Sequence, residues 1–468
     1  MKKISMMLVA LFLFIATGFA QQAKYVFYFI GDGMGVNQVN ATEMYRGELD
    51  GKIGTTPLLF TQFPSMTVAT TFAVNNGVTD SAASGTALAT GHKTKYGTIG
   101  MLEDQKTPAN SIAVWAKKKG AQVGISTSVS VDHATPAAFY AHQPDRGMYY
   151  EIGNDLVKSN VDFFAASDFL LPQGKDGKQP NLYELVQQAG YTIYRGYDEY
   201  VKGDKKDKVI LFQPKGGANR SIPYAIDRKP GDMSLQQIVK AGIDFFSKDL
   251  SKGFFFMVEG GEIDWACHSN DAATVFHEII DMDEAIKEAY EFYLKHPDET
   301  LIVVTADHET GGITLGIKGK SRLNLKALAS QKMSEKAFTE LVNNMRKETG
   351  NKVSWEMIQQ ALKENFGFWD TLELSEAQEA RLKNIYNESF GNKDVVLKES
   401  EYQKAEPIAA AAKEIISEIA WIGWTTGGHT AGFVPVTAIG AGAELFHQRT
   451  DNAEIPRKIA KAAGYEAE

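Results

Sequence analysis

The chain has 468 residues, of which 44% are hydrophobic and 23% are charged, the balance of a globular protein that folds around a sizeable core. Its formal net charge of -9 argues against a nucleic-acid partner, because phosphate backbones are bound by stripes of Lys and Arg. The single cysteine, Cys267, excludes an intrachain disulfide, so stability must come from packing or from bound metal ions.

The start of the chain has the pattern of a secretory signal. Two lysines precede an apolar run from Ile4 to Ala16, and the small residues Gly18 and Ala20 follow. This run is too short for a transmembrane helix, and the expected cleavage after Ala20 removes it from the mature chain. We therefore predict a signal peptide over residues 1–20, no membrane span in the mature chain, and a periplasmic or secreted protein.

The mature chain opens with a continuous apolar run, Tyr25 to Ile30, which stops at Gly31 and Asp32. Continuous rather than alternating hydrophobicity predicts a strand buried on both faces, as in parallel sheets covered by helices. Three later runs repeat this design, in AQVGISTSVSVDHAT, FFFMVEGGEID and LIVVTADHE. Polar side chains that can bind metals or donate protons follow the four runs: Asp32, then His133 and Thr135, then Glu259, then Asp307 and His308.

Helical patterns separate these runs, and the longest extends from Asp271 to Leu294. The alternation predicts an α/β fold, a doubly wound and mostly parallel central sheet with helices on both faces. In such a sheet, functional groups gather beyond the carboxyl ends of the strands. The four polar ends should therefore meet at one edge.

A charged, helix-rich region from about Gly319 to Ile422 differs from the rest, with helix starts expected at Ser334, Ser354 and Ser375. No Pro- or Ser-rich linker separates it from its surroundings. We interpret residues 319–422 as an insertion that acts as a lid or crown within one catalytic domain, residues 21–468.

The stretch VTDSAASGTALATGH places Asp80 and Ser81 at the head of a run of small residues. A serine at a helix start is usually only a cap for a free backbone N–H. The alternative is a nucleophile, because a helix N-terminus also favours an oxyanion or a phosphate. Ser81 lies in no G-x-S-x-G elbow and no general base stands beside it, so a nearby metal ion would have to activate its hydroxyl.

Two pairs of acid and imidazole have the spacing of metal ligands, although each acid alone could be a turn residue or half of an ion pair. Asp264 and His268 are four residues apart, so a helix would place both on one face, toward one ion. Asp307 and His308 are adjacent after a strand, where a bend can aim both inward. A carboxylate with an imidazole is ordinary ligation for Zn²⁺.

Two further features complete the chemistry. Carboxylates such as Asp32 and Glu259, together with a hydroxyl, suit the harder ion Mg²⁺. Arg146, in FYAHQPDRG, can present a guanidinium fork to two phosphate oxygens, although an arginine on the surface is the simpler interpretation.

Five motifs in matching order closely resemble the alkaline phosphatase family: IGDGMG, VTDSAASGTALATGH, VEGGEID, TADHET and GGHTAG. The resemblance covers nearly the whole mature chain outside the helical insertion. It implies an exported phosphomonoesterase that acts through a phosphoserine and uses two Zn²⁺ and one Mg²⁺. It further implies small phosphate monoesters as substrates, and family members are often homodimers.

Carried over residue by residue, the resemblance implies that Ser81 is the nucleophile and Arg146 the phosphate clamp. Only the flanking GGHTAG pattern identifies His429, on which spacing alone is silent. The implied ligands are Asp264, His268 and His429 for one zinc ion, Asp32, Asp307 and His308 for the second, and Asp32, Thr135 and Glu259 for the magnesium ion.

Two positions vary within the family. His133 stands near the magnesium site where some members carry Asp, which leaves the identity of the third ion open. Trp265 stands where other members carry Lys or His near the phosphate. We expect Trp265 to weaken retention of product phosphate, because it supplies no positive charge.

Three other interpretations compete with a phosphomonoesterase. A sulfatase would normally need a C-x-P-S-R or S-x-P-S-R segment, and none occurs. A phosphodiesterase is disfavoured by Arg146, which suits a terminal phosphate with two free oxygens. A carrier of metal or phosphate would not need the nucleophile Ser81. Cys267 could supply a thiolate ligand to zinc, but packing as a small apolar side chain is the simpler interpretation.

Overall fold

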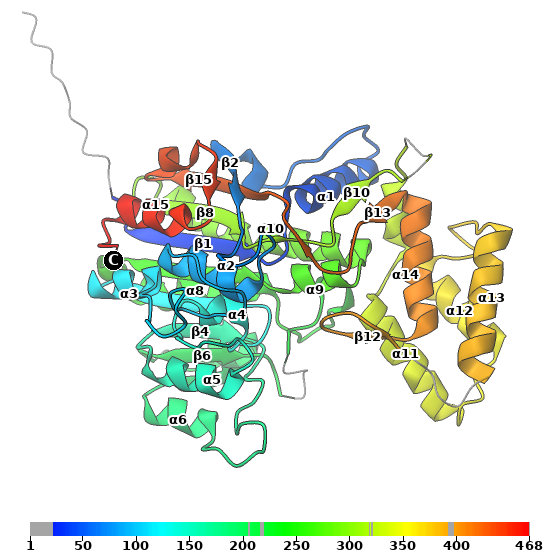
Figure 1. Ribbon diagram of the computed structural model, residues 1–468, viewed down its shortest axis with the longest axis horizontal. Helices are drawn as coiled ribbons and strands as arrows, with labels where there is room; N and C mark the ends of the chain where they lie inside the picture. The colour runs from blue at the N-terminus through cyan, green and yellow to red at the C-terminus, as the bar shows by residue number, and fades with distance from the viewer. Residues whose placement is uncertain are drawn as a thin grey trace, which may run out of the picture.

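The computed structural model describes residues 22–467 except 205, 216–219, 318, 320–321 and 392–396. The predicted signal peptide lies outside the described residues. At the centre is a ten-stranded sheet (Figure 1). Its strands, in spatial order, are β16 (Thr450–Asp451), β2 (Ser65–Thr70), β15 (Val434–Gly440), β8 (Thr300–Ala306), β1 (Tyr25–Gly31), β7 (Phe254–Gly260), β3 (Gln122–Thr127), β4 (Phe163–Ala166), β6 (Val209–Phe212) and β5 (Thr192–Arg195).

The sheet is mostly parallel. Every pairing from β8 across to β5 is parallel, whereas β15 runs antiparallel to both β8 and β2. The four predicted apolar runs are the neighbouring strands β8, β1, β7 and β3. The predicted doubly wound α/β class is confirmed.

The first strand shows why its hydrophobic run is continuous. Phe27 points to one face, where its ring lies 5.6 Å from that of Phe292. Tyr28 points to the other face, where its ring lies 6.1 Å from that of Phe139 and its hydroxyl donates to the carbonyl of Leu88. Both faces of the sheet are therefore covered, and neither set of alternate residues can be polar.

Helices form the two covering layers. On the Phe27 face, α8 (Leu235–Phe246) and α10 (Ala272–Lys295) pack on the central strands. Asp271 is the N-cap of α10, in agreement with the predicted start of the long helical pattern. On the Tyr28 face lie α2 (Ser81–Thr90), α3 (Ile112–Lys118), α4 (Ala134–Ala137) and α15 (Glu454–Ala463). The remaining helices outside the insertion are α1 (Val36–Leu49), α5 (Tyr149–Lys158), α6 (Leu182–Gln188), α7 (Tyr197–Lys202) and α9 (Glu262–His268). The 3-10 turns outside the insertion are η1 (Phe60–Gln62), η2 (Ala225–Asp227), η3 (Ser247–Lys252) and η5 (Ala443–Phe446), and η4 (Leu325–Ser330) lies within it.

The helices of residues 319–422 form a group at one side of the sheet, on the right in Figure 1. Ser334 and Ser354 cap their helices as predicted, and Ser375 forms a capping box with Gln378. The elements of this group are α11 (Glu335–Glu348), α12 (Trp355–Phe366), α13 (Glu376–Gly391), β11 (Lys398–Glu399), β12 (Lys404–Ala405) and α14 (Pro407–Ala420). Among the described residues, no helix is long and apolar enough to cross a bilayer.

Strand register brings the predicted functional groups to one edge. Ile30 of β1 pairs with Glu259 of β7, and Gly31 pairs with Ala306 of β8. Asp32 follows β1 and Asp307 follows the neighbouring strand β8, so the two residues lie at the same level along the sheet edge. Two small antiparallel pairs close this edge: β9 (Glu309–Thr310) with β14 (His429–Thr430), and β10 (Ile313–Leu315) with β13 (Ile422–Trp424).

Candidate active site

The serine at the head of α2 is not the helix cap. Asp80 is the N-cap, and its Oδ1 accepts the backbone N–H of Ala83 at 3.1 Å. Ser81 is therefore left free of the capping role, and its Oγ lies 3.3 Å from the Nε2 of His308. Its neighbours in α2 are small and buried, which lets the helix pack close beneath the sheet edge.

One group of candidate metal ligands joins α9 to the β14 strand. His268 Nε2 lies 3.3 Å from an oxygen of Asp264 and 3.2 Å from His429 Nε2. The other ring nitrogens face backbone carbonyls, His268 Nδ1 with Gly427 at 2.6 Å and His429 Nδ1 with Thr79 at 2.8 Å. With each Nδ1 as the donor, both Nε2 lone pairs turn toward the same point, the arrangement that orients imidazoles on a metal ion.

The charge balance of this group also favours a cation. Burial lowers the pKa of His268, but the Asp264 carboxylate opposite raises it. The net result is a pKa of about 9. Burial raises the pKa of Asp264, yet His268 and His429 hold it well below its usual range. A divalent ion can take over the role that a proton on His268 otherwise plays.

A second group lies beside the serine. His308 Nε2 is 3.4 Å from Asp32 Oδ1 and 3.2 Å from Asp307 Oδ2, and all three side chains are fully buried. Burial raises the pKa of Asp32 and of Asp307, and the repulsion between neighbouring carboxylates adds to it. Two buried acids this close require a cation to stay ionised.

A third group shares Asp32 with the second. It consists of Asp32, His133 and Glu259, with the Thr135 hydroxyl 3.5 Å from Asp32 Oδ2. Burial raises the pKa of Glu259 to about 7 although Thr127 donates a hydrogen bond to it. Burial and nearby Arg146 lower the pKa of His133 to about 3, so this imidazole is neutral and able to bind a metal ion.

All three groups contain carboxylate oxygens that lack hydrogen-bond partners. Leaving a buried polar atom unpaired costs free energy, so such atoms point to a ligand or ion. The donor sets, nitrogen and oxygen in each group, are compatible with Zn²⁺, and the third also suits Mg²⁺. The unpaired oxygens are Asp32 Oδ1, Glu259 Oε1, Asp264 Oδ2 and Asp307 Oδ2.

Arg146 faces the site and is not a surface arginine. Its Nη1 donates to Asp80 Oδ2 at 3.1 Å, while Nη2 lies 3.4 Å from His133 Nε2 and donates to the Tyr402 hydroxyl at 3.3 Å. Only 19% of the side chain is exposed. These contacts fix the guanidinium next to Asp80, the residue that precedes Ser81.

Four further residues support this constellation, and sequence reasoning gave none of them a role. Thr310 donates to Asp264 at 2.5 Å and lies 3.2 Å from His308 Nδ1, so it links two metal-ligating groups. Its place in the TADHET motif is a signal that could have found it. The position of Asp80 next to Ser81 in the sequence is also a signal that could have found it. Glu401 and Tyr402 come from the insertion and carry no signal in the sequence.

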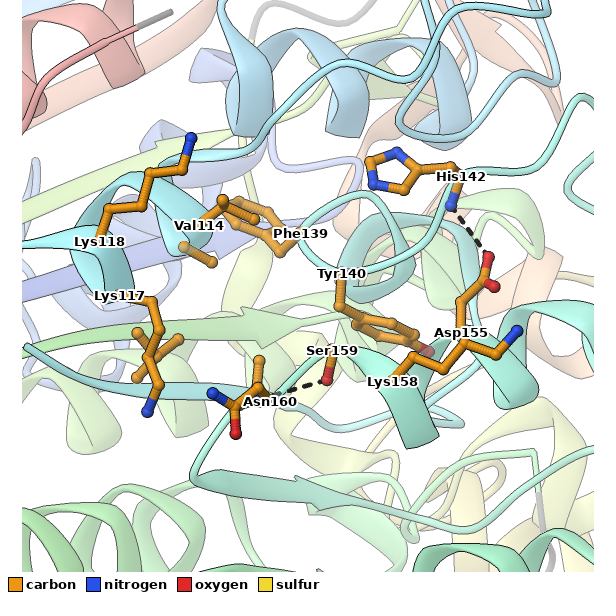
Figure 2. A pocket seen from close by; sticks show the side chains of 13 residues that line it. Val114, Lys117, Lys118, Phe139, Tyr140, His142, Asp155, Lys158, Ser159 and Asn160 are labelled. Atoms are coloured by element: carbon orange, nitrogen blue, oxygen red, sulfur yellow. Dashed lines mark hydrogen bonds between the residues drawn. The ribbon is translucent and has the colours of Figure 1, made fainter. Parts of the chain in front are cut away.

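Two other features lie apart from these groups. Cys267 is fully buried, burial raises its pKa, and it belongs to none of the ligand groups among the described residues. Figure 2 shows a cavity of about 450 Å³ between α3 and α5, lined by apolar side chains such as Val114 and Phe139 and by lysines at its rim. It contains none of the candidate ligands, so the reaction chemistry belongs to the sheet edge.

Comparisons with known proteins point to one family. A family model described as alkaline phosphatase matches residues 23–168 and 156–465. Alkaline phosphatase 3 of Bacillus subtilis is 31% identical over 463 residues, which cover 96% of this chain and 90% of that protein.

Solved structures give the same result. The cold-active alkaline phosphatase of a psychrophilic Shewanella sp. is similar with a TM-score of 0.79 at 28% identity, covering 94% of this chain and 99% of that one. A variant of the alkaline phosphatase from the Antarctic bacterium TAB5, with one histidine replaced by glutamate and Mg bound in its M3 site, has a TM-score of 0.66 at 25% identity. The match covers 96% of this chain and 99% of the variant.

Proposed function

The chain belongs to the alkaline phosphatase family and is a phosphoric monoester hydrolase, and we propose that it is exported, metal-dependent and acts through a phosphoserine at Ser81. The observation that carries the mechanism is the position of Ser81 Oγ, 3.3 Å from His308 within a cluster of three ligand groups. Export rests on the signal pattern of residues 1–20. Family members are often homodimers, and the mass in solution tests whether this chain is one.

We assign Zn²⁺ to the first and second groups and Mg²⁺ to the third. Bound there, the ions supply Lewis acidity that lowers the pKa of the Ser81 hydroxyl and stabilises negative charge on the departing oxygen. Magnesium in the third group is supported by its carboxylate and hydroxyl oxygen donors. His133 adds a nitrogen donor that Zn²⁺ also accepts, so metal analysis of the isolated protein decides between the two ions.

The protein's own residues perform two in-line displacements. Ser81 Oγ forms a bond to phosphorus as the bond to the ester oxygen breaks, and the alcohol leaves with a proton. Water then attacks the phosphoserine, the bond to Oγ breaks, and inorganic phosphate is released. Throughout, Arg146 donates to two non-bridging oxygens, Asp80 holds the guanidinium in place, and the positive end of α2 favours the anion on Ser81.

A phosphodiesterase activity is the closest rival. A diester leaves one terminal oxygen fewer for the guanidinium fork of Arg146, so we expect monoesters to react faster. Turnover of mono- and bis-nitrophenyl phosphate compares the two, and faster diester cleavage would reverse this ranking.

Acid quenching after brief mixing with a labelled phosphate monoester tests the phosphoserine. The wild-type protein should retain label on Ser81, and Ser81→Ala should retain none and lose on the order of a thousandfold in turnover. Ser84→Ala, one turn along the same helix, is the matched control and should still be labelled. Absence of label in the wild-type protein while ester is consumed would overturn the covalent mechanism.

A further inference from the structure

A short loop of the insertion, Ser400–Gln403, reaches the active site. It connects β11 to β12, and β12 lies on the side of the insertion that faces α9 (Figure 1). The loop is anchored at its end, because the Gln403 side chain donates to Glu335 at 2.6 Å and also to Ser269 beside α9. The two residues within it, Glu401 and Tyr402, therefore have defined positions above the first ligand group.

Glu401 places a negative charge at the opening next to His268. Its Oε2 lies 3.5 Å from His268 Nε2, the nitrogen that also faces Asp264 and His429. The side chain is 48% exposed. In the part of the chain that the structure describes, no Lys or Arg forms an ion pair with it, whereas Glu399 on the same hairpin is paired with Lys404 at 2.6 Å.

Two tyrosines flank this carboxylate. Tyr402 stacks on Trp265 with ring centroids 4.7 Å apart, and its ring lies 5.2 Å from that of His268. Tyr96 is 47% exposed, and burial together with the nearby Asp80 and Glu401 carboxylates raises its pKa. A carboxylate with aromatic rings is the chemistry that recognises an ammonium group.

Positive charge in the site comes from Arg146 and Arg220. Arg146 donates to Asp80 and lies near His133, and the Arg220 guanidinium lies 5.6 Å from the Trp265 ring centroid. Arg146 also donates to the Tyr402 hydroxyl at 3.3 Å, and among the described residues neither arginine forms an ion pair with Glu401. The site therefore offers a guanidinium to an anionic phosphate, and a carboxylate without a Lys or Arg partner to a cationic alcohol.

The orientation of the ester follows from the proposed function, on which this inference rests. If the departing oxygen lies at the group of Asp264, His268 and His429, the alcohol extends past His268 toward the insertion loop. We propose that Glu401, assisted by Tyr402, determines specificity for monoesters whose alcohol carries a positive charge, such as phosphocholine and phosphoethanolamine.

The test compares two esters of the same shape. For each enzyme, kcat/KM is measured with phosphocholine and with its uncharged isostere 3,3-dimethylbutyl phosphate, so that changes in metal content or turnover cancel in the ratio. We expect the wild-type protein to prefer phosphocholine by about 3- to 10-fold, as one exposed carboxylate and a cation–π contact allow. Glu401→Gln should bring the ratio near one, and Glu399→Gln, the matched control, should leave it unchanged.

Several outcomes would overturn the proposal. These are a wild-type ratio of one or less, an unchanged ratio in Glu401→Gln, and an equal fall with both esters, which would assign Glu401 to turnover or metal binding. The preference should also weaken as salt is added, because the pair is exposed. Failure of the proposed function is distinct, since neither ester nor p-nitrophenyl phosphate would then yield a phosphoserine.

Discussion

Asp80 forms an ion pair with Arg146 at 3.1 Å, and the same carboxylate caps the helix that Ser81 begins. One oxygen orients the Arg146 guanidinium and the other fixes the start of α2. A single side chain thus sets the distance between Ser81 and the guanidinium. This explains why Ser81 does not cap its own helix.

The two roles of Asp80 can be separated by substitution. Asn caps helices as well as Asp but carries no charge, so Asp80→Asn should preserve stability while Arg146 loses the partner that fixes its fork. We expect KM and the inhibition constant of inorganic phosphate to rise by about 3- to 10-fold, because a buried charge-assisted contact that positions the guanidinium is lost. Asp80→Ala should show the same kinetic change and lose about 1 kcal/mol of stability. A lower phosphate inhibition constant in Asp80→Asn would mean that Asp80 acts by neutralising Arg146 and not by orienting it.

Metal removal should affect stability as well as activity. Asp32 belongs to two ligand groups and Glu259 to one, and both have an oxygen without a hydrogen-bond partner. Stripping the ions leaves these buried carboxylates uncompensated, so the chelated protein should unfold at lower temperature and recover when zinc and magnesium are restored.

Elemental analysis sharpens this prediction. Asp32→Ala should reduce the bound content of two ions, and Glu259→Ala the content of one. Full activity and an unchanged melting temperature after complete chelation would contradict the assignment of all three groups.

The strands, the long helix and the edge at which the ligands meet could be predicted from the sequence, because each depends on local patterns. Tyr25 to Ile30 is buried on both faces, and Asp271 to Leu294 matches α10 to within one residue at each end. Asp264 and His268 share a helix face for the same reason.

Other parts of the site depend on the tertiary fold. His429 reaches Asp264 only because β14 pairs with β9, and no spacing rule encodes that pairing. Tyr402 contacts Arg146, which lies 256 residues earlier in the chain. The sequence indicates where the helices of the insertion begin, but not how they pack against the rest of the protein. The identity of the cap at α2 was also beyond local reasoning, since Asp80 and Ser81 are both good cap residues.

Trp265 should weaken the binding of product phosphate. Its ring stacks on Tyr402 and lies 5.9 Å from the His133 ring, where it excludes water without adding charge. Trp265→Lys places a cation there and should lower the inhibition constant of inorganic phosphate by about 3- to 10-fold, the range of one partly exposed ionic contact. Trp265→Phe keeps an aromatic ring for the stack and should leave the constant near the wild-type value. Equal inhibition in all three proteins would show that this position does not influence the phosphate.

Asp283, on α10 and remote from the ligand groups, gives stability a pH dependence. Its carboxylate accepts the backbone N–H groups of Leu59 and Phe60, with Arg46 as far as 4.0 Å away. Burial raises its pKa from 3.8 to about 6.

The sign of the effect follows from proton linkage. Between pH 4 and pH 6 the folded state keeps a proton that the unfolded state has lost, so stability falls as pH rises through this range. A shift of about two pKa units corresponds to about 3 kcal/mol, fully lost above the folded pKa. Asp283→Asn cannot ionise, so the free energy of unfolding of wild type minus that of the variant, from urea titrations, should fall across this window. Subtraction removes every other titrating group, including the metal ligands, and a difference that stays flat from pH 4 to pH 8 would contradict an ionisable buried Asp283.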